Sequence, residues 1–334
     1  MANAAFSPKD FKVGIVEEAT PGTIPTLTTT NIIKQLDVDS IASPTLNVNQ
    51  VLEPRTQDGR ILSSVDFFQD NKNSAKEITL TGTFHNDAGH RMLIQSVCGL
   101  TIATADGDLA LPYNATGVSG RYGVAQEDAT FTLVVASPDT TDGYNFVMAG
   151  AMCTNFQITA DSGTDGGQYK FSATISSGRP VTLDNETPES IGAYSANPIP
   201  ISRLATKKVY SQDVVLNSFG VTIDSPAVYM GTSITGYDAF ARGSEISVTA
   251  TAQVKYDSVT RGFINSFDSQ STGDHDAADA FTMTQTTATD CSIAIPSAVL
   301  TNVELSEGDI MMLDVEMKAV SLGSGNIITF DLTS

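Results

Sequence analysis

Two short segments far apart in the chain share nearly the same alternating pattern. Residues 76–84 read KEITLTGTF and residues 244–252 read SEISVTATA, so that Glu77 corresponds to Glu245 and Ile78 to Ile246. Polar residues alternate with apolar or small ones in both segments, which is the period of a β-strand with one buried and one solvated face. The sequence therefore predicts the same amphipathic strand twice, once in each half of the chain.

The repeat extends over most of the chain. Five further segments recur in the same order in both halves, and six short matches in one order indicate a duplicated domain. The five further pairs are NIIKQLDVDSIASPTLNV with DVVLNSFGVTIDSPAVYM, HRMLIQSV with TRGFINSF, ATFTLVVA with DAFTMTQT, AMCTNFQIT with AVLTNVELS, and YKFSATIS with MMLDVEMKA.

Each copy contains one helical stretch among segments typical of strands. In the second copy an apolar stripe recurs at helical spacing through Val259, Phe263, Ile264 and Phe267. Asp87 and Asp257 are the acidic residues expected at the two helix N-termini. We therefore expect a mainly β protein with two tandem antiparallel β-sandwich or half-barrel domains, each with one short α-helix.

A segment between the two copies is rich in Pro, Ser and Asn, which is typical of an extended linker or arm. The predicted organisation is a first domain at residues 1–180 with long loop insertions, a linker at 181–207, and a second domain at 208–334. 

Composition and charge exclude several classes of protein. The chain has 18 Lys and Arg against 38 Asp and Glu, a formal net charge of −20 that opposes nucleic-acid binding. Its three cysteines, Cys98, Cys153 and Cys291, are far apart and odd in number, so we expect no disulfide framework. No apolar run has the length of a signal peptide or a membrane span. We expect a protein folded in a cytoplasm that does not bind membranes.

The residues that could carry chemistry do not form a known catalytic or metal pattern. His85 and His90 are not spaced as an H-E-x-x-H pair, and His275 lies in an acidic stretch that fits no standard metal site. Residues 161–167, DSGTDGG, lack the closing Glu of a calcium loop and are predicted to form a turn. No nucleophile elbow, P-loop or dinucleotide-binding glycine pattern is present. We predict no enzyme activity, no cofactor and no metal, with a β-sandwich hydrolase as an alternative.

The opening of the chain and the order of its segments resemble those of one protein family. Residues 12–26 read KVGIVEEATPGTIPT, and they are followed by a strand pair, a long loop, the KEITLTGTF strand, a short helix, and the FTLVV and AMCTNFQI strands. This order resembles the tail tube, or major tail, proteins of long-tailed bacteriophages (siphoviruses). In that family each domain is a β-sandwich flanked by a helix. Six domains make a ring, one sheet of each domain joins a continuous β-barrel around a lumen, and rings stack into a tube. For a duplicated chain the resemblance implies a homotrimeric, pseudo-hexameric ring.

The resemblance assigns the polar face of the repeated strands to a lumen with neutral or acidic groups. Passing DNA would find no row of Lys or Arg to bind there. The predicted lumen residues are Asn47, Asn49, Glu77, Thr79, Thr81, Thr83, Asn155, Gln157 and Thr159 in the first copy, and Glu245, Ser247, Thr249, Thr251, Asn302, Glu304, Asp314 and Glu316 in the second. The opposite face is predicted to pack inside the sandwich, through Ile78, Leu80, Phe84, Phe156, Ile158, Phe171, Ile246, Val248, Val303, Leu305 and Leu313.

Two long segments without regular periodicity are predicted to stack one ring on the next. They are residues 53–75 and their shorter counterpart 231–244, with the N-terminal arm and the linker beside them. Apolar side chains in a polar loop need a partner surface. The predicted stacking residues are Arg55, Arg60, Ile61, Leu62, Phe67, Phe68, Tyr237 and Phe240.

The resemblance also implies partners and a location. These are further copies of the chain, a tape measure protein in the lumen during assembly, terminator and baseplate proteins at the tube ends, and DNA in transit during ejection. The expected location is the virion tail, assembled in the host cytoplasm. Two further alternatives stay open: a tail terminator or baseplate-hub ring of the same fold, and a tandem β-sandwich surface or adhesin protein of a bacterium.

Overall fold

The structure is a computed structural model that describes most of the 334 residues of the chain. The described residues are 10–27, 32–40, 49–52, 67–70, 76–100, 108–112, 130–138, 145–179, 181–184, 191–194, 199–232, 238–242, 246–270, 278–286, 291–307, 310–321 and 325–332.

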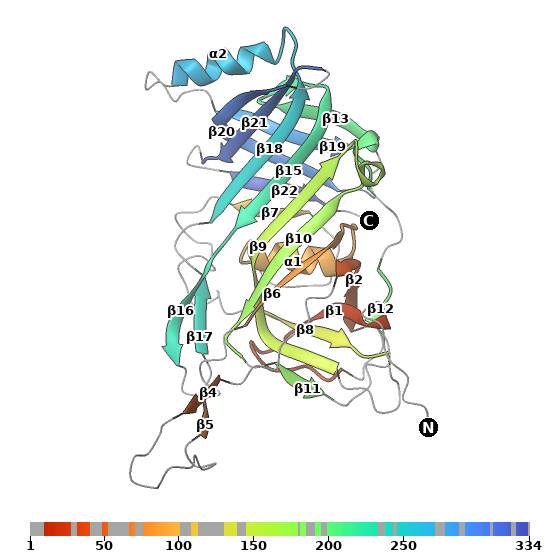
Figure 1. The fold of residues 1–334 in the computed structure, drawn as a ribbon, viewed down its shortest axis with the longest axis vertical. Coiled ribbons are helices and arrows are strands. Elements are labelled where there is room, and N and C mark those ends of the chain that lie inside the picture. Colours follow the sequence, from red (N-terminus) through yellow and green to blue (C-terminus); the bar gives the residue numbers. More distant parts are fainter. Residues whose placement is uncertain are drawn as a thin grey trace.

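The described part of the chain is mainly β, as predicted, with two α-helices, α1 (Ala88–Val97) and α2 (Arg261–Gln270). Eighteen of its strands belong to one hydrogen-bonded sheet (Figure 1). They are β1 (Lys12–Glu17), β2 (Ile33–Leu36), β3 (Val38–Ser40), β6 (Lys76–Thr83), β7 (Leu109–Pro112), β8 (Phe131–Ala136), β9 (Asn145–Asp161), β10 (Lys170–Ser177), β11 (Thr182–Asp184), β12 (Ile191–Gly192), β13 (Leu204–Val209), β14 (Gln212–Asp213), β15 (Leu216–Asp224), β18 (Ser247–Lys255), β19 (Asp279–Gln285), β20 (Ser292–Ser306), β21 (Met312–Ala319) and β22 (Asn326–Asp331).

Eight of these strands form one continuous antiparallel layer, which we call the shared sheet. Its strand order is β3-β6-β10-β9-β15-β18-β21-β20. The first four strands come from the first half of the chain and the last four from the second half. In the sequence alignment of the two halves, β3, β6, β10 and β9 correspond to β15, β18, β21 and β20. The same strand order therefore occurs twice, and the pairing of β9 with β15 joins the two halves (Figure 1).

Each half also contributes a second layer of strands. The orders are β12-β2-β1-β8-β9-β11 and β14-β13-β19-β20-β22-β7. The long strands β9 and β20 belong to both layers, because their N-terminal parts pair in the second layer and their C-terminal parts in the shared sheet. Strand β7, from the first half, pairs with β22 of the second half. The predicted linker contains β11, β12 and the start of β13, so it takes part in the sheet.

The two halves agree in register at two of their three strand pairings. Asn155 lies opposite Thr174, and the equivalent Asn302 lies opposite the equivalent Glu316. Ser40 pairs with Thr81 as Thr222 pairs with Thr249. The register differs in the third pairing, which is β6 with β10 in the first half and β18 with β21 in the second. Ala173 pairs with Leu80, whereas Val315, its equivalent, pairs with Ala252 and not with Val248. This shift is an even number of residues, so each side chain stays on its face.

One hydrophobic core cluster runs through both halves of the chain. Most of the side chains predicted for the sandwich interior are buried, and Ile246 and Val303 are half-buried. The prediction for Leu305 is wrong, because this side chain is 43% exposed. It lies near the end of β20, at the edge of the shared sheet, where no further strand of the described residues pairs with it. The buried members of the predicted set are Ile78, Leu80, Phe84, Phe156, Ile158, Phe171, Val248 and Leu313.

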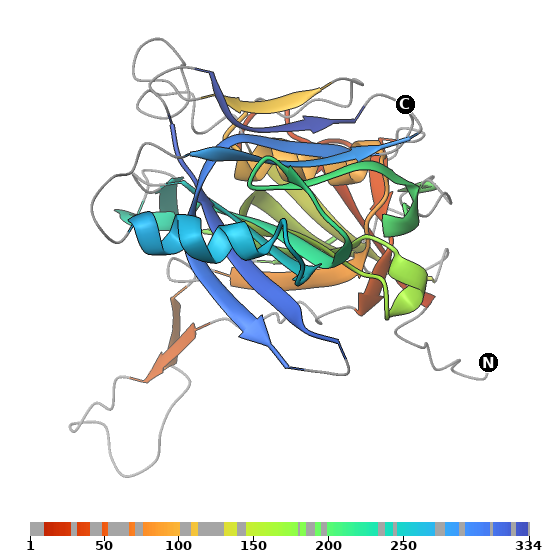
Figure 2. The same cartoon turned by 90° about the horizontal axis from the view of Figure 1, so that it is seen from above.

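The two helices differ in how deeply they pack. Helix α1 begins at Asp87, whose side chain accepts a hydrogen bond from the backbone N–H of His90, and nearly all of its residues are buried. Asp257 accepts backbone N–H bonds from Val259 and Thr260 just before α2. Of the apolar stripe predicted for α2, Phe263 is buried but Val259 and Phe267 are exposed. Figures 1 and 2 show the reason: α1 lies within the molecule, whereas α2 lies across its outer end.

Candidate functional surface

The polar side chains of the shared sheet form rows that cross it from strand to strand. Residues paired across antiparallel strands point to the same face, so a strand with polar residues at every second position extends the row of its neighbour. Four such rows are Thr79–Thr174–Asn155–Asp224–Ser247, Thr81–Ser172–Gln157–Thr222–Thr249–Lys318, Thr83–Lys170–Thr159–Gly220–Thr251–Glu316–Asn302, and Asp161–Ser218–Gln253–Asp314–Glu304. We call this surface the polar face.

The rows bring together predicted lumen residues from both halves of the chain. Glu77, Thr79, Thr81, Thr251, Asn302, Glu304 and Glu316 are exposed, and Asn155, Gln157, Thr159, Ser247, Thr249 and Asp314 are half-buried. Thr83 is buried, although it was predicted to face a lumen. Asn49 lies in β4 (Asn49–Leu52), which pairs with β5 (Phe67–Asp70) outside the shared sheet. Asn47 and Glu245 lie outside the described residues.

Several residues of the polar face were missed by the sequence analysis. They come from β10 and β15, namely Ser172, Thr174, Ser218, Thr222 and Asp224, together with Asp161 and Gln253. Their alternation was visible in the sequence, but their place in the same rows depends on strand pairing.

A chain of hydrogen bonds fixes one end of the polar face. The Ser162 hydroxyl donates to Asn217 Oδ1 at 2.8 Å, and Asn217 Nδ2 donates to Gln253 Oε1 at 2.6 Å. Gln253 Nε2 then donates to Asp314 Oδ1 at 2.9 Å. Each amide both accepts and donates, so its orientation is set by its neighbours. The chain of bonds holds four polar side chains from both halves in one arrangement.

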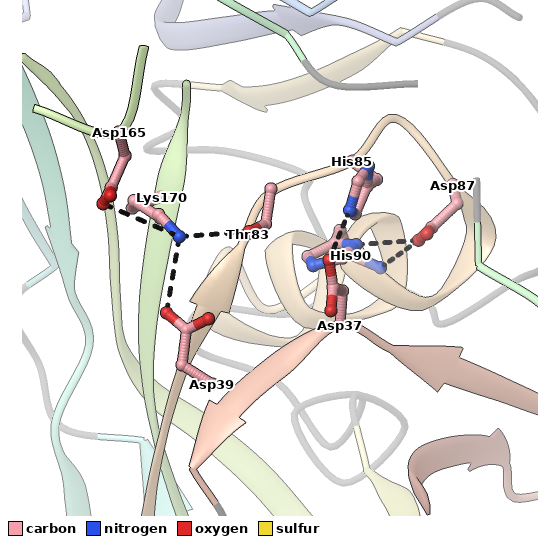
Figure 3. Close-up of polar contacts among 8 residues, drawn as sticks. All are labelled: Asp37, Asp39, Thr83, His85, Asp87, His90, Asp165 and Lys170. Carbon is pink, nitrogen blue, oxygen red and sulfur yellow. Dashed lines mark hydrogen bonds and ion pairs between the residues drawn. The ribbon is translucent and has the colours of Figure 1, made fainter. Parts of the chain in front are cut away.

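The lysine nearest the first half's threonines is surrounded by acceptors (Figure 3). Lys170 Nζ lies 3.2 Å from Thr83 Oγ1, 3.5 Å from Asp39 Oδ2 and 3.9 Å from Asp165 Oδ2. Lys170 therefore lies over Thr83, which explains the burial of that residue. Two carboxylates balance the charge of this lysine, so it is not available as an isolated cation to bind a phosphate.

The polar face as a whole carries more negative than positive charge. In the four rows, Asp161, Asp224, Glu304, Asp314 and Glu316 are opposed only by Lys170 and Lys318. Two hollows of about 300 and 240 Å³ open on this face, and both are lined by Ser218, Phe219 and Thr251. The face therefore offers a concave surface of hydroxyl, amide and carboxylate groups. Among the described residues no cluster of His, Cys, Asp or Glu has the size needed to hold a metal ion.

Two histidines near the start of α1 are bound to aspartates (Figure 3). His85 Nε2 lies 2.9 Å from Asp37 Oδ2, and His90 Nδ1 lies 2.8 Å from Asp87 Oδ1. Burial by itself would raise the pKa of Asp87, but the charge and hydrogen bonds of His90 outweigh it and lower that pKa. Tyr194 of the predicted linker stacks on His85 at 5.2 Å between ring centroids. This cluster ties the linker, α1 and the residue before β3 together, which is a structural role.

The two segments predicted to stack between rings both contain part of a hairpin. Strand β5 pairs with β4 in the first half, and β17 (Asp238–Arg242) pairs with β16 (Ala227–Thr232) in the second. Figure 1 shows both hairpins leaving the molecule at the same end. Phe67 and Phe68 lie in β5 and Phe240 lies in β17. Arg55, Arg60, Ile61, Leu62 and Tyr237 lie outside the described residues.

Neither a protein-family model nor a curated protein matches the chain. None of the helices in the described ranges is long and apolar enough to cross a membrane.

Proposed function

We propose that this protein is a structural subunit of a phage tail tube, built of two tail-tube-like domains. Three chains form a pseudo-hexameric ring through the shared sheet, and rings stack into a hollow tube through which DNA passes. The observation that carries the proposal is the pairing of β9 with β15, because it joins two equivalent sets of four strands within one chain.

This internal junction provides a template for a junction between chains. In the described part of the sheet, β3 and the C-terminal part of β20 are the two edges, and they are the equivalents of β15 and β9. Strand β20 of one chain can therefore pair with β3 of the next as β9 pairs with β15. Because Gln157 lies opposite Thr222, the template places Glu304 opposite Ser40 of the neighbouring copy.

The exposure of Leu305 supports this template. Its equivalent in the first half is Ile158, which is 1% exposed because Val221 of β15 pairs with it. An unpaired edge strand leaves backbone N–H and C=O groups without partners and invites association with another strand. Pairing of β20 with β3 would satisfy these groups and would cover Leu305.

The strand count gives a channel of suitable size. Three chains with eight strands each form a barrel of ~24 strands, which at ~4.8 Å spacing and ~40° tilt has a backbone diameter of roughly 48 Å. Eight strands alone would close to a barrel filled by its own side chains. A ring of three chains therefore leaves an open lumen wide enough for duplex DNA.

The chemistry of the polar face suits passage of DNA without binding. Protein cations bind DNA by releasing the counterions of its phosphates, and each cation removed weakens binding. The polar face has two lysines in its rows, and carboxylates outnumber them. DNA would therefore slide along hydroxyl and amide groups. A tape measure protein would occupy the same lumen before DNA, and the two hairpins would contact the neighbouring ring.

The substitution Leu305→Lys tests ring closure against a matched control. Leu305 is 43% exposed and Leu183, in β11 outside the shared sheet, is 46% exposed. A lysine at either site should leave the isolated chain folded, but only Leu305→Lys should place a charge in the junction between chains. Native mass spectrometry and negative-stain electron microscopy should show trimeric rings or tubes for the wild type and Leu183→Lys, and single chains for Leu305→Lys.

Three outcomes would speak against the proposal. A wild-type chain that stays monomeric at high concentration would refute ring formation, and would favour a surface or adhesin protein. Rings that never stack, even at high concentration, would favour a terminator or hub protein. Unchanged assembly of Leu305→Lys would show that β20 is not the joining edge.

A further inference from the structure

The turn between β20 and β21 exposes two apolar side chains, whereas the linker covers the equivalent turn of the first half. Ile310 is 67% exposed and Met311 is 41% exposed. The equivalent residues are Gln168 and Tyr169, and Tyr169 is fully buried. The equivalence is supported by matching backbone bonds, since Tyr169 O accepts from Phe84 N–H as Met311 O accepts from Tyr256 N–H.

In the first half the predicted linker covers this turn. Tyr169 N–H donates to Ile199 O at 2.9 Å, and Gln168 forms a β-bridge with Pro200. Ile201 packs so closely on Gly167 that a Cβ there would lie 2.7 Å from its side chain. The covering segment runs directly into β13, through a 3-10 turn at Ile201–Arg203.

The segment before β1 corresponds to this covering segment. Strands β1 and β13 are both six residues long and occupy equivalent places in the second layers, beside β8 and β19. Leu204 pairs with Gln285, and Val13 pairs with the equivalent Val135. Leu204 therefore corresponds to Val13, so Lys9 takes the position of Pro200 and Pro8 that of Ile199. Asp10 is in a 3-10 turn, as are the residues before β13. Residues 1–9 lie outside the described part of the chain, and they include the apolar Phe6 and the basic Lys9.

We infer that residues 1–9 of one chain dock on the β20–β21 turn of the neighbouring chain in the ring. This inference rests on the proposed ring, in which β3 of one chain lies beside β20 of the next. By the internal template, Lys9 lies beside Ile310, and Pro8 O accepts a hydrogen bond from Met311 N–H. Phe6 covers part of the apolar group formed by Leu305, Ile310 and Met311.

Charge also favours residues 1–9 over an acidic segment as the group that covers this turn. Exposed Glu304 and Glu307 flank the apolar group, and the arm carries Lys9. The first half also has a basic residue on the covering segment and acidic residues on the covered turn. There the linker carries Arg203 beside apolar residues, and the turn it covers carries Asp161 and Asp165.

The test is a disulfide between chains in the full-length protein. Native Cys98, Cys153 and Cys291 are buried, so introduced cysteines dominate the oxidation. The double variant Pro8→Cys with Met311→Cys should form covalent dimers and trimers when rings are oxidised. The control pairs Pro8→Cys with Thr79→Cys on the polar face, and should form at least about tenfold less product, as expected for cysteines too far apart to bridge.

The outcomes separate this inference from the proposed ring. Rings without covalent dimers, or a disulfide between positions 8 and 311 that forms only within one chain, would overturn the docking of the arm while leaving the ring in place. Absence of rings in the wild type would overturn both. As a second measurement, deletion of residues 2–9 should weaken ring assembly roughly tenfold or more, as expected for loss of one buried aromatic contact. Unchanged assembly of the deletion variant would also overturn the inference.

Discussion

The substitution Glu18→Gln should test how the second layer of the first half is held together. Glu18 is only 9% exposed. Its Oε2 accepts from the Gly22 backbone N–H at 2.5 Å and the Thr130 hydroxyl at 2.8 Å. Its Oε1 accepts from the Thr132 hydroxyl at 2.6 Å and the Gly150 backbone N–H at 2.8 Å. The carboxylate thus joins the end of β1 to β8 and to the N-terminal part of β9.

Glutamine cannot replace this carboxylate in either orientation of its amide. The two hydroxyls can rotate to accept a hydrogen bond, but a backbone N–H can only donate. Whichever way the amide turns, its NH₂ group meets the N–H of Gly22 or Gly150. The variant therefore loses a charge-assisted hydrogen bond and leaves a buried donor without an acceptor, which we expect to cost about 2–4 kcal/mol of unfolding free energy.

The measurement is urea unfolding of Glu18→Gln and of Glu17→Gln, a matched control at the exposed neighbouring residue. The control should change the unfolding free energy by less than about 0.5 kcal/mol. Both variants should keep the wild-type m-value, because the surface exposed on unfolding is unchanged. Hydrogen exchange at the Gly22 or Gly150 amide should become faster in Glu18→Gln. Equal stability of the two variants would refute the reasoning.

Three other variants probe the junction of the halves, the start of α1 and the polar face. Tyr169→Phe leaves Gln285 Nε2, now 2.7 Å from the tyrosine hydroxyl, without that acceptor, and should lower the unfolding free energy in urea by about 1–3 kcal/mol; no change would contradict the role of this bond. Asp87→Asn keeps the helix cap but loses the charge beside His90. Folding lowers the pKa of Asp87, so the wild type should have a higher unfolding free energy than Asp87→Asn at pH 7. This difference should shrink as the pH drops below about 4 and through the pKa of Asp87 in the folded protein. A difference that does not change with pH would contradict this. Thr81→Lys with Thr249→Lys adds two cations to one row of the polar face, and should leave rings intact but slow DNA ejection from assembled particles; normal infectivity would count against the lumen assignment.

The sequence was sufficient to predict which face of most strands is buried. Polar and apolar residues alternate in β6, β10 and β18, and the side chains predicted inward are buried there. This worked because the face of a strand residue depends only on its position in a period of two. The helix cap at Asp87 and the turn at residues 161–167 were also predicted, since both depend on residues close together in the chain.

Leu305 and helix α2 show where this local reasoning failed. Leu305 and Ile158 occupy equivalent positions in equivalent strands, yet only Ile158 is covered, because β9 has a neighbour in β15 and the end of β20 is an edge. Likewise Phe267 is exposed although its stripe matches the buried face of α1. Two copies of one pattern thus have different exposure because they have different neighbours.

The sequence by itself determined that one strand pattern occurs twice and which face of each strand is polar. Only the tertiary structure decided that the two copies share one sheet, that β7 of the first half pairs with β22 of the second, and that two predicted loops each contain part of a hairpin. The physical reason is that backbone groups of any strand can pair with those of any other, so a local pattern does not specify the partner. Partner choice depends on loop lengths and packing across the whole chain, and here it leaves equivalent strands as the two edges of the shared sheet.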